Sequence, residues 1–116
     1  MDKTGNEAIL YGFTGRADGA NPAASLILDS EGNLYGTTVQ GGTAGCAPYS
    51  GCGVVFKLDA VGTETVLYSF TGGADGASPA APVLRDLAGN LYGTTQLGGG
   101  TGCNGSGCGV VFKIAP

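Results

Sequence analysis

Two aspartates in matching segments are the side chains best placed to do chemistry in this sequence. Asp18 begins the segment Asp-Gly-Ala-Asn-Pro, which also contains Asn21, and Asp75 begins Asp-Gly-Ala-Ser-Pro. A carboxylate and an amide at this spacing can bind a cation or hydrogen-bond a sugar. The competing interpretation, which we favour, is that each aspartate caps its own turn ahead of Gly and Pro.

One aromatic residue in a loop is a further candidate. Tyr49 lies in a Gly-rich loop, and the corresponding loop later in the chain carries Asn104 instead. An exposed aromatic ring there can stack on a ligand such as a sugar, although a packed loop residue explains the tyrosine equally well. The candidate ligand-binding residues are therefore Asp18, Asn21, Tyr49, Asp75 and Asn104, with carbohydrate as the first ligand to consider.

The sequence offers little for catalysis. It contains no His, which excludes Ser-His and Cys-His dyads. Its Gly-rich stretches lack the phosphate-binding pattern G-x-x-x-x-G-K-[S/T]. Two loop carboxylates can in principle flank a glycosidic bond, so a glycan-active hydrolase or lyase is the alternative. We expect a non-catalytic chain with no metal and no cofactor.

Composition narrows the partners and the fold class. A net charge of −4 with only five basic residues leaves no patch to neutralise phosphates, so nucleic-acid binding is not expected. No apolar run approaches the roughly 18 residues that span a bilayer, so membrane insertion is not expected either. The 24 glycines follow no three-residue period and alternate with β-branched and aromatic runs. Gly-rich turns between short strands favour an all-β fold.

An internal repeat organises the chain. The segment Gly-Asn-Leu-Tyr-Gly-Thr-Thr at 32–38 returns at 89–95, which is 57 residues later, and the flanking text returns with it. A period of this length is typical of propeller blades and stacked repeat units. We assign an N-terminal extension to 1–8, the first repeat to 9–65 and the second to 66–116.

Each repeat contains four short runs typical of β-strands. They lie at 9–14, 25–29, 34–38 and 53–58, and again at 66–71, 82–86, 91–95 and 110–113. Some are apolar on both faces, since Val54 and Phe56 point one way while Val55 points the other. Radial stacking of sheets buries both faces, whereas the strands of a β-sandwich, the main rival, usually alternate apolar with polar. We predict two four-stranded antiparallel β-propeller blades.

The repeated segments resemble the GloVer tandem repeat. The likeness rests on Leu-Tyr-Ser-Phe at 67–70, on D-G-A-x-P, on G-N-L-Y-G-T-T and on G-C-G-V-V-F-K, and it extends from Ile9 to Ile114. The resemblance implies a propeller-like fold and an extracellular or bacterial cell-surface location, and it supplies no catalytic residues. Residues 1–7 lack the pattern of a signal peptide, so the chain either stays inside the cell or comes from a longer exported precursor.

The four cysteines are predicted to form local disulfides if the protein is exported. The pairs are Cys46 with Cys52 and Cys103 with Cys108, one of three possible connectivities. The loops differ by one residue between the cysteines, which suits a disulfide better than a coordination cage. A zinc site without His, or free thiols, are the alternatives.

The phase of the repeat predicts how the blades are completed. In propellers resembling this one, 25–29 is the inner strand A, followed by B (34–38) and C (53–58). The outer strand D comes from the Leu-Tyr-Ser-Phe run of the next repeat. The run at 9–14 then has no blade before it, and the last A-B-C set has no strand D.

Two blades cannot close a ring, so we expect a cyclic homo-oligomer. The N-terminal strand of one copy would complete the second blade of the next. Three copies give six blades, which we favour over eight from four copies. The alternative is a fragment of a longer propeller with no independent function. Strand parity places the long D–A and B–C loops on one face of each blade, where a ligand site is expected.

Overall fold

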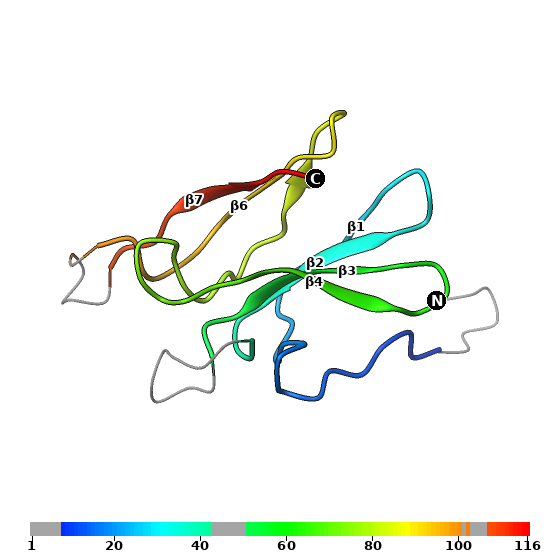
Figure 1. Ribbon diagram of the computed structural model, residues 1–116, viewed down its shortest axis with the longest axis horizontal. Coiled ribbons are helices and arrows are strands. Elements are labelled where there is room, and N and C mark those ends of the chain that lie inside the picture. Colours follow the sequence, from blue (N-terminus) through cyan, green and yellow to red (C-terminus); the bar gives the residue numbers. More distant parts are fainter. Residues whose placement is uncertain (1–7, 43–50, 101, 103–106) are drawn as a thin grey trace.

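The computed structural model describes residues 8–42, 51–100, 102 and 107–116. Their regular structure is entirely β, in agreement with the predicted class (Figure 1). The strands are β1 (Ile27–Leu28), β2 (Leu34–Thr38), β3 (Val54–Leu58), β4 (Glu64–Ser69), β5 (Leu84–Arg85), β6 (Leu91–Thr94) and β7 (Val111–Ile114). A helix long and apolar enough to cross a membrane is not found among the described residues.

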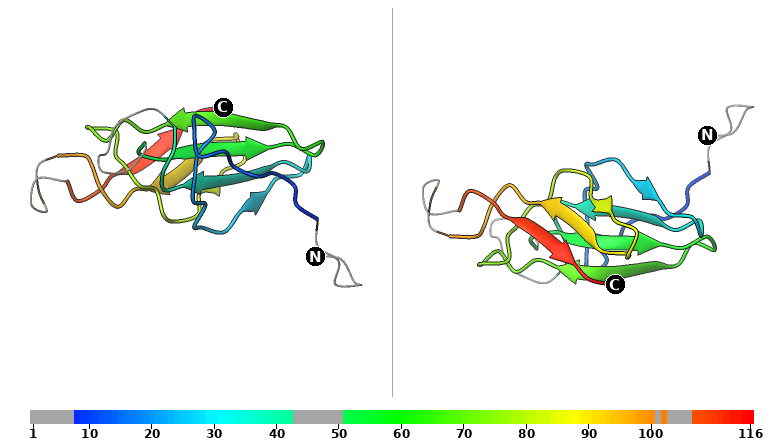
Figure 2. Two further views of the ribbon diagram at one scale, coloured as in Figure 1. Left: turned by 90° about the horizontal axis from the view of Figure 1, so that it is seen from below. Right: turned by 90° about the horizontal axis from the view of Figure 1, so that it is seen from above.

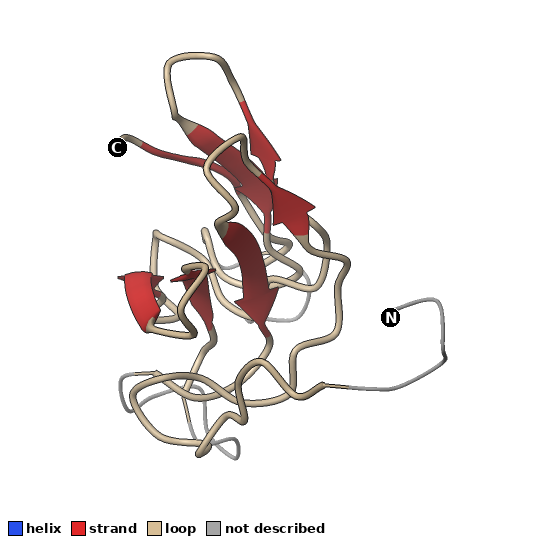
Figure 3. Cartoon of the chain, turned by 90° about the vertical axis from the view of Figure 1, so that its right-hand side faces the viewer, coloured by secondary structure: helices blue, strands red, loops and turns tan. Residues whose placement is uncertain are grey.

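The strands form two antiparallel sheets, each a simple meander. The first has the order β1-β2-β3-β4 and the second has the order β5-β6-β7. The strands of both sheets are drawn red in Figure 3. β4 opens the second repeat in the sequence, yet it pairs with β3 of the first, in a register that sets Val55 opposite Tyr68. The strand order is therefore the one that the phase of the repeat predicted.

The predicted strand at 9–14 is not formed. These residues have no strand assignment in the structure, and Ile9 and Leu10 are 80% and 61% exposed. The segment runs along the side of the first sheet that faces away from the second sheet (blue in Figure 1; Figure 2). A strand needs a neighbouring backbone to bond, and no described strand pairs with this segment.

The main core lies between the two sheets. Tyr35 and Val55 from the first sheet and Leu91 from the second are at most 7% exposed, and Leu67 and Phe112 pack against them. The rings of Phe70 and Phe112 meet edge to face across this boundary, with centroids 5.2 Å apart. Large apolar and aromatic side chains supply most of the burial energy here.

The opposite face of the first sheet is also covered. Phe56 is 4% exposed and its ring meets Phe13 edge to face at 5.0 Å. Leu58 on the same face is 6% exposed and lines a pocket with Leu10 and Leu26. Burial of both faces agrees with the prediction made from the apolar pattern of 54–58.

The long loops of each repeat meet on one face, as strand parity predicted. Ala20 and Gln40 exchange backbone hydrogen bonds of 2.8 and 3.2 Å, and Ala77 and Leu97 do the same in the second repeat. Gly53 begins the return strand with φ +98°, and a Cβ there would lie 2.3 Å from the Thr38 carbonyl oxygen. Glycine is therefore required where the loop crosses this close to the strand.

Candidate functional site

The outer edge of β7 differs from the matching edge of β3, although the two sequences are nearly identical. Val55 on β3 is fully buried, because the second sheet packs on its face and β4 pairs alongside it. Val111, which occupies the same place on β7, is 81% exposed. Within the described part of the chain, no strand pairs with the outer side of β7.

The backbone of β7 shows which groups this edge offers. The backbone groups of Val110, the residue before β7, point toward Thr95 at the end of β6. The Val110 carbonyl accepts the Thr95 N–H at 3.0 Å, and the Val110 N–H donates to the Thr95 hydroxyl at 3.0 Å. Successive residues of an antiparallel strand direct their backbone groups to alternate sides. Val111 and Lys113 therefore direct theirs away from β6, where an added strand can bond them.

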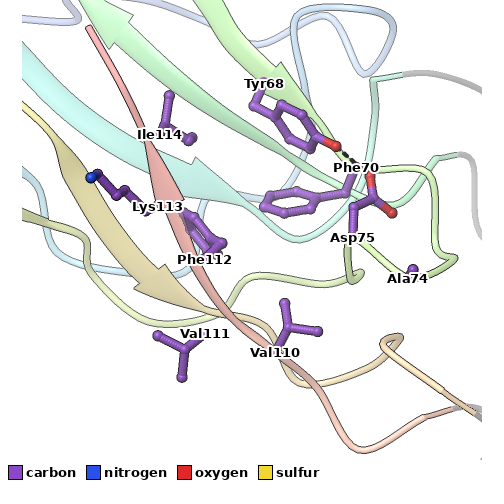
Figure 4. A pocket seen from close by; sticks show the side chains of 9 residues that line it. All are labelled: Tyr68, Phe70, Ala74, Asp75, Val110, Val111, Phe112, Lys113 and Ile114. Atoms are coloured by element: carbon purple, nitrogen blue, oxygen red, sulfur yellow. Dashed lines mark hydrogen bonds between the residues drawn. The ribbon is translucent and has the colours of Figure 1, made fainter.

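A groove of about 360 Å³ lies beside this edge (Figure 4). One side is formed by β7 and the other by the end of β4 and the loop after it. Its lining residues are Tyr68, Phe70, Ala74, Asp75, Val110, Val111, Phe112, Lys113 and Ile114. The walls are mostly apolar, which fits the side chains of a β-strand better than a charged small molecule.

A tyrosine–aspartate pair fixes one wall of the groove. The Tyr68 hydroxyl donates to Asp75 at 2.7 Å, and the Thr71 hydroxyl and amide donate to the same carboxylate at 2.6 and 3.0 Å. Burial by itself raises the pKa of Asp75, but the hydrogen bonds from Thr71 and Tyr68 outweigh it, so the pKa lies below its usual value. The hydrogen bond between Tyr68 and Asp75 raises the pKa of Tyr68.

The first repeat contains the same arrangement around Asp18. The Tyr11 hydroxyl donates to this carboxylate at 2.8 Å, and the Thr14 hydroxyl and amide donate at 2.6 and 3.0 Å. Burial favours a raised pKa for Asp18, but the hydrogen bonds from Thr14, Tyr11 and Arg16 lower it to about 2. The hydrogen bond to Asp18 raises the pKa of Tyr11 to about 12. Both oxygens of each aspartate accept bonds from their own loop, which supports the turn-capping interpretation.

The structure keeps Asp18 and Asp75 in separate loops of separate repeats. Asn21 adopts φ +58° and donates from its side-chain amide to the side chain of Gln40. Ser78 occupies the matching place in the second repeat, with φ +55°. These residues join the D–A loop to the B–C loop of the same repeat.

Several predicted site residues lie outside the described part of the chain. They are Tyr49, Asn104, Cys46 and Cys103. Of the described cysteines, Cys52 is fully buried and Cys108 is exposed, and neither is a free thiol. The disulfide pairings remain a prediction.

Sequence reasoning did not find the tyrosine–aspartate pairs. Besides the two above, Tyr35 donates to Asp29 at 2.8 Å and Tyr92 donates to Asp86 at 2.9 Å. The signal was present, because the spacing of each pair recurs in both repeats. In each pair the tyrosine hydroxyl donates to the carboxylate of an aspartate in a nearby turn.

The fold and this edge define an all-β repeat protein of two sheets. In the second sheet, the outer edge of β7 is not paired with any described strand. The family profile of the Gloeobacter/Verrucomicrobia repeat matches residues 1–116, so the chain belongs to this family. The resemblance seen in the sequence is thereby confirmed. A comparison with curated proteins finds no match to the chain.

Proposed function

We propose that the chain is a non-catalytic, two-blade β-propeller module that assembles by taking up a fourth strand on β7. The observation that supports this is the contrast between β3, whose outer edge pairs with β4, and β7, whose outer edge pairs with no described strand. The two edges have the same sequence from the first valine to the lysine, so the same kind of strand fits both.

Assembly into a ring follows from the number of blades. Propellers have about four to eight blades, and two cannot enclose an axis. Three copies of the chain make six blades, the form that we favour, and four copies make eight. In each case the contact is head-to-tail, so a closed ring leaves no β7 edge open.

The outer edge of β7, called the acceptor edge below, can be tested with a peptide that has the sequence of residues 63–70. A fluorescent form is added to the full chain at high dilution, where neighbouring copies compete least for the edge, and binding is read as anisotropy; unlabelled peptide added afterwards should displace it. Val111→Pro removes the outward N–H, whereas the matched control Val111→Thr keeps it. We expect saturable binding to the wild type and to the control, reduced at least about tenfold in the proline variant. Equal binding by all three, or none by any, would contradict the proposal.

We further propose that the face formed by the long loops binds a ligand, with carbohydrate as the first candidate, on a protein displayed at the bacterial cell surface. Support comes from the described part of this face. A pocket of about 270 Å³ there is lined by Val39, Gln40, Ser78, Gln96 and Leu97. Amide side chains beside apolar surface are suited to sugar hydroxyls and ring faces.

A glycan array with the full chain tests this part. Binding that leaves the glycan length unchanged, and that falls in Gln96→Ala, supports a binding module. Shortened glycans would point instead to a hydrolase or lyase. Absence of binding across the array would remove carbohydrate from the proposal and leave the assembly role to be judged by the peptide experiment.

A further inference from the structure

We propose that the strand taken up by β7 is the segment 8–12 of a second copy, in the register that β4 adopts on β3. This inference rests on the proposed function, because it names the partner of the acceptor edge. It is carried by a comparison of β4 with residues 11–13.

β4 and the residues that follow it make two separate sets of contacts. On one side the strand pairs with β3, where Tyr68 lies opposite Val55 and Val66 lies opposite Phe56. On the other side, Tyr68 binds Asp75 and Phe70 meets Phe112, both in the second repeat. The segment therefore joins one sheet to the next.

Residues 11–13 make only the second of these sets. Tyr11 binds Asp18 at 2.8 Å and Phe13 meets Phe56 at 5.0 Å, which are the equivalents of the Tyr68 and Phe70 contacts one repeat later. They do not pair with any described strand, and Ile9 is 80% exposed. The segment is thus held against its own first sheet with its strand edge unused.

β7 has the packing contact with a neighbouring sheet but lacks a paired strand on its outer edge. It packs against the first sheet through Phe112, but no described strand bonds its outer edge. The free segment and the free edge are on opposite sides of the molecule, separated by the first sheet (Figure 1). The segment of one chain lies away from β7 of that same chain (Figure 1), whereas a second copy can bring the two together.

The repeat spacing fixes the register of this junction. Tyr11 corresponds to Tyr68 and Val111 to Val55, so these two residues lie opposite one another. Ile9 lies opposite Phe112 in the same way. Leu10 takes the place of Leu67, the extra residue at the bulge where the β3–β4 register shifts.

The test uses two variants of the chain, each of which has lost one of the two surfaces that form the junction. Val111→Pro disables the acceptor edge, with Val111→Thr as control. Ile9→Asp combined with Leu10→Asp disables the donor, with the double threonine variant as control. Ile9, Leu10 and Val111 are all more than 60% exposed, so each variant is expected to fold. Thermal unfolding checks this.

Light scattering then gives the outcome. The wild type and both controls should form one discrete oligomer. The proline variant and the double aspartate variant should each be a monomer of 11.3 kDa. An equal mixture of the two variants should give a heterodimer, because only one junction can form. Oligomers of the aspartate variant, or a mixture that stays monomeric, would overturn the inference. A monomeric wild type that still binds the peptide would overturn it too, while leaving the acceptor edge of the proposed function intact.

Discussion

The ring of Phe70 lies 5.2 Å from the ring of Phe112, at an interplanar angle of 66°, and so couples the end of β4 to the second sheet. Phe70 is 1% exposed. It is the largest side chain that is fully buried in the described residues. The stability of the pair of sheets should therefore depend strongly on this one residue.

Phe70→Ala is expected to lower the free energy of unfolding by about 3–5 kcal/mol, because a buried ring is lost and a cavity is left. Urea unfolding followed by circular dichroism measures the loss. Phe13→Ala is the matched control, since Phe13 makes the same ring contact but is only partly buried. Equal losses in the two variants would contradict this account of the sheet boundary.

Stability should fall at both extremes of pH. Asp18, with a pKa of about 2, and Asp86, held at about 2 chiefly by the Asn90 side chain, bind protons less tightly in the folded state than the usual value near 4. Their contribution is therefore complete above about pH 4 and lost as the pH falls toward 2. The pKa of Glu64 is raised by burial, so Glu64 acts in the opposite direction and offsets part of this loss.

The alkaline limb comes from the tyrosines. The pKa of Tyr11 is raised to about 12, so its contribution is complete below about pH 10 and is lost as the pH rises toward 12. Thermal unfolding between pH 2 and 12 should show a plateau with two falling limbs. Asp18→Asn should flatten the acid limb, and an unchanged profile in that variant would contradict the assignment.

Gly53→Ala should destabilise the chain by at least about 2 kcal/mol. The residue has φ +98°, and the added Cβ would lie 2.3 Å from a backbone oxygen. Gly73→Ala is the control, because its Cβ would meet nothing closer than 3.7 Å and the first repeat has Arg16 at the same place. The control should change stability by less than about 0.5 kcal/mol. Similar melting temperatures for both variants would contradict the requirement for glycine.

The predicted disulfides can be checked by intact mass. Before reduction the protein should be lighter than the reduced form by two hydrogens for each bridge, and digestion should yield one linked peptide containing Cys46 and Cys52. Replacing both Cys103 and Cys108 by Ser should cost about 2 kcal/mol, as expected for a short loop. A mass that reduction leaves unchanged would refute the pairing and with it one support for an exported location.

Several features were predictable because their causes are local in the sequence. Glycines and aspartates mark the turns, and the aromatic and β-branched runs between them mark the strands. The alternation in Val54-Val55-Phe56 predicted burial on both faces, and the phase of the repeat predicted that β4 pairs backward with β3. The binding of Tyr68 to Asp75 was not found, because it depends on how the loop folds back toward the strand.

The sequence by itself determined the order of the strands, the phase of the repeat and the membership in a repeat family. Only the tertiary structure decided what becomes of nearly identical segments. Val55 is buried and Val111 is exposed, because the second sheet packs on the face that carries Val55, whereas no described sheet covers the matching face at Val111. Likewise, the runs at 9–14 and 66–71 share the same pattern, yet only the second contributes to a strand, β4, since only it pairs with a described neighbour, β3.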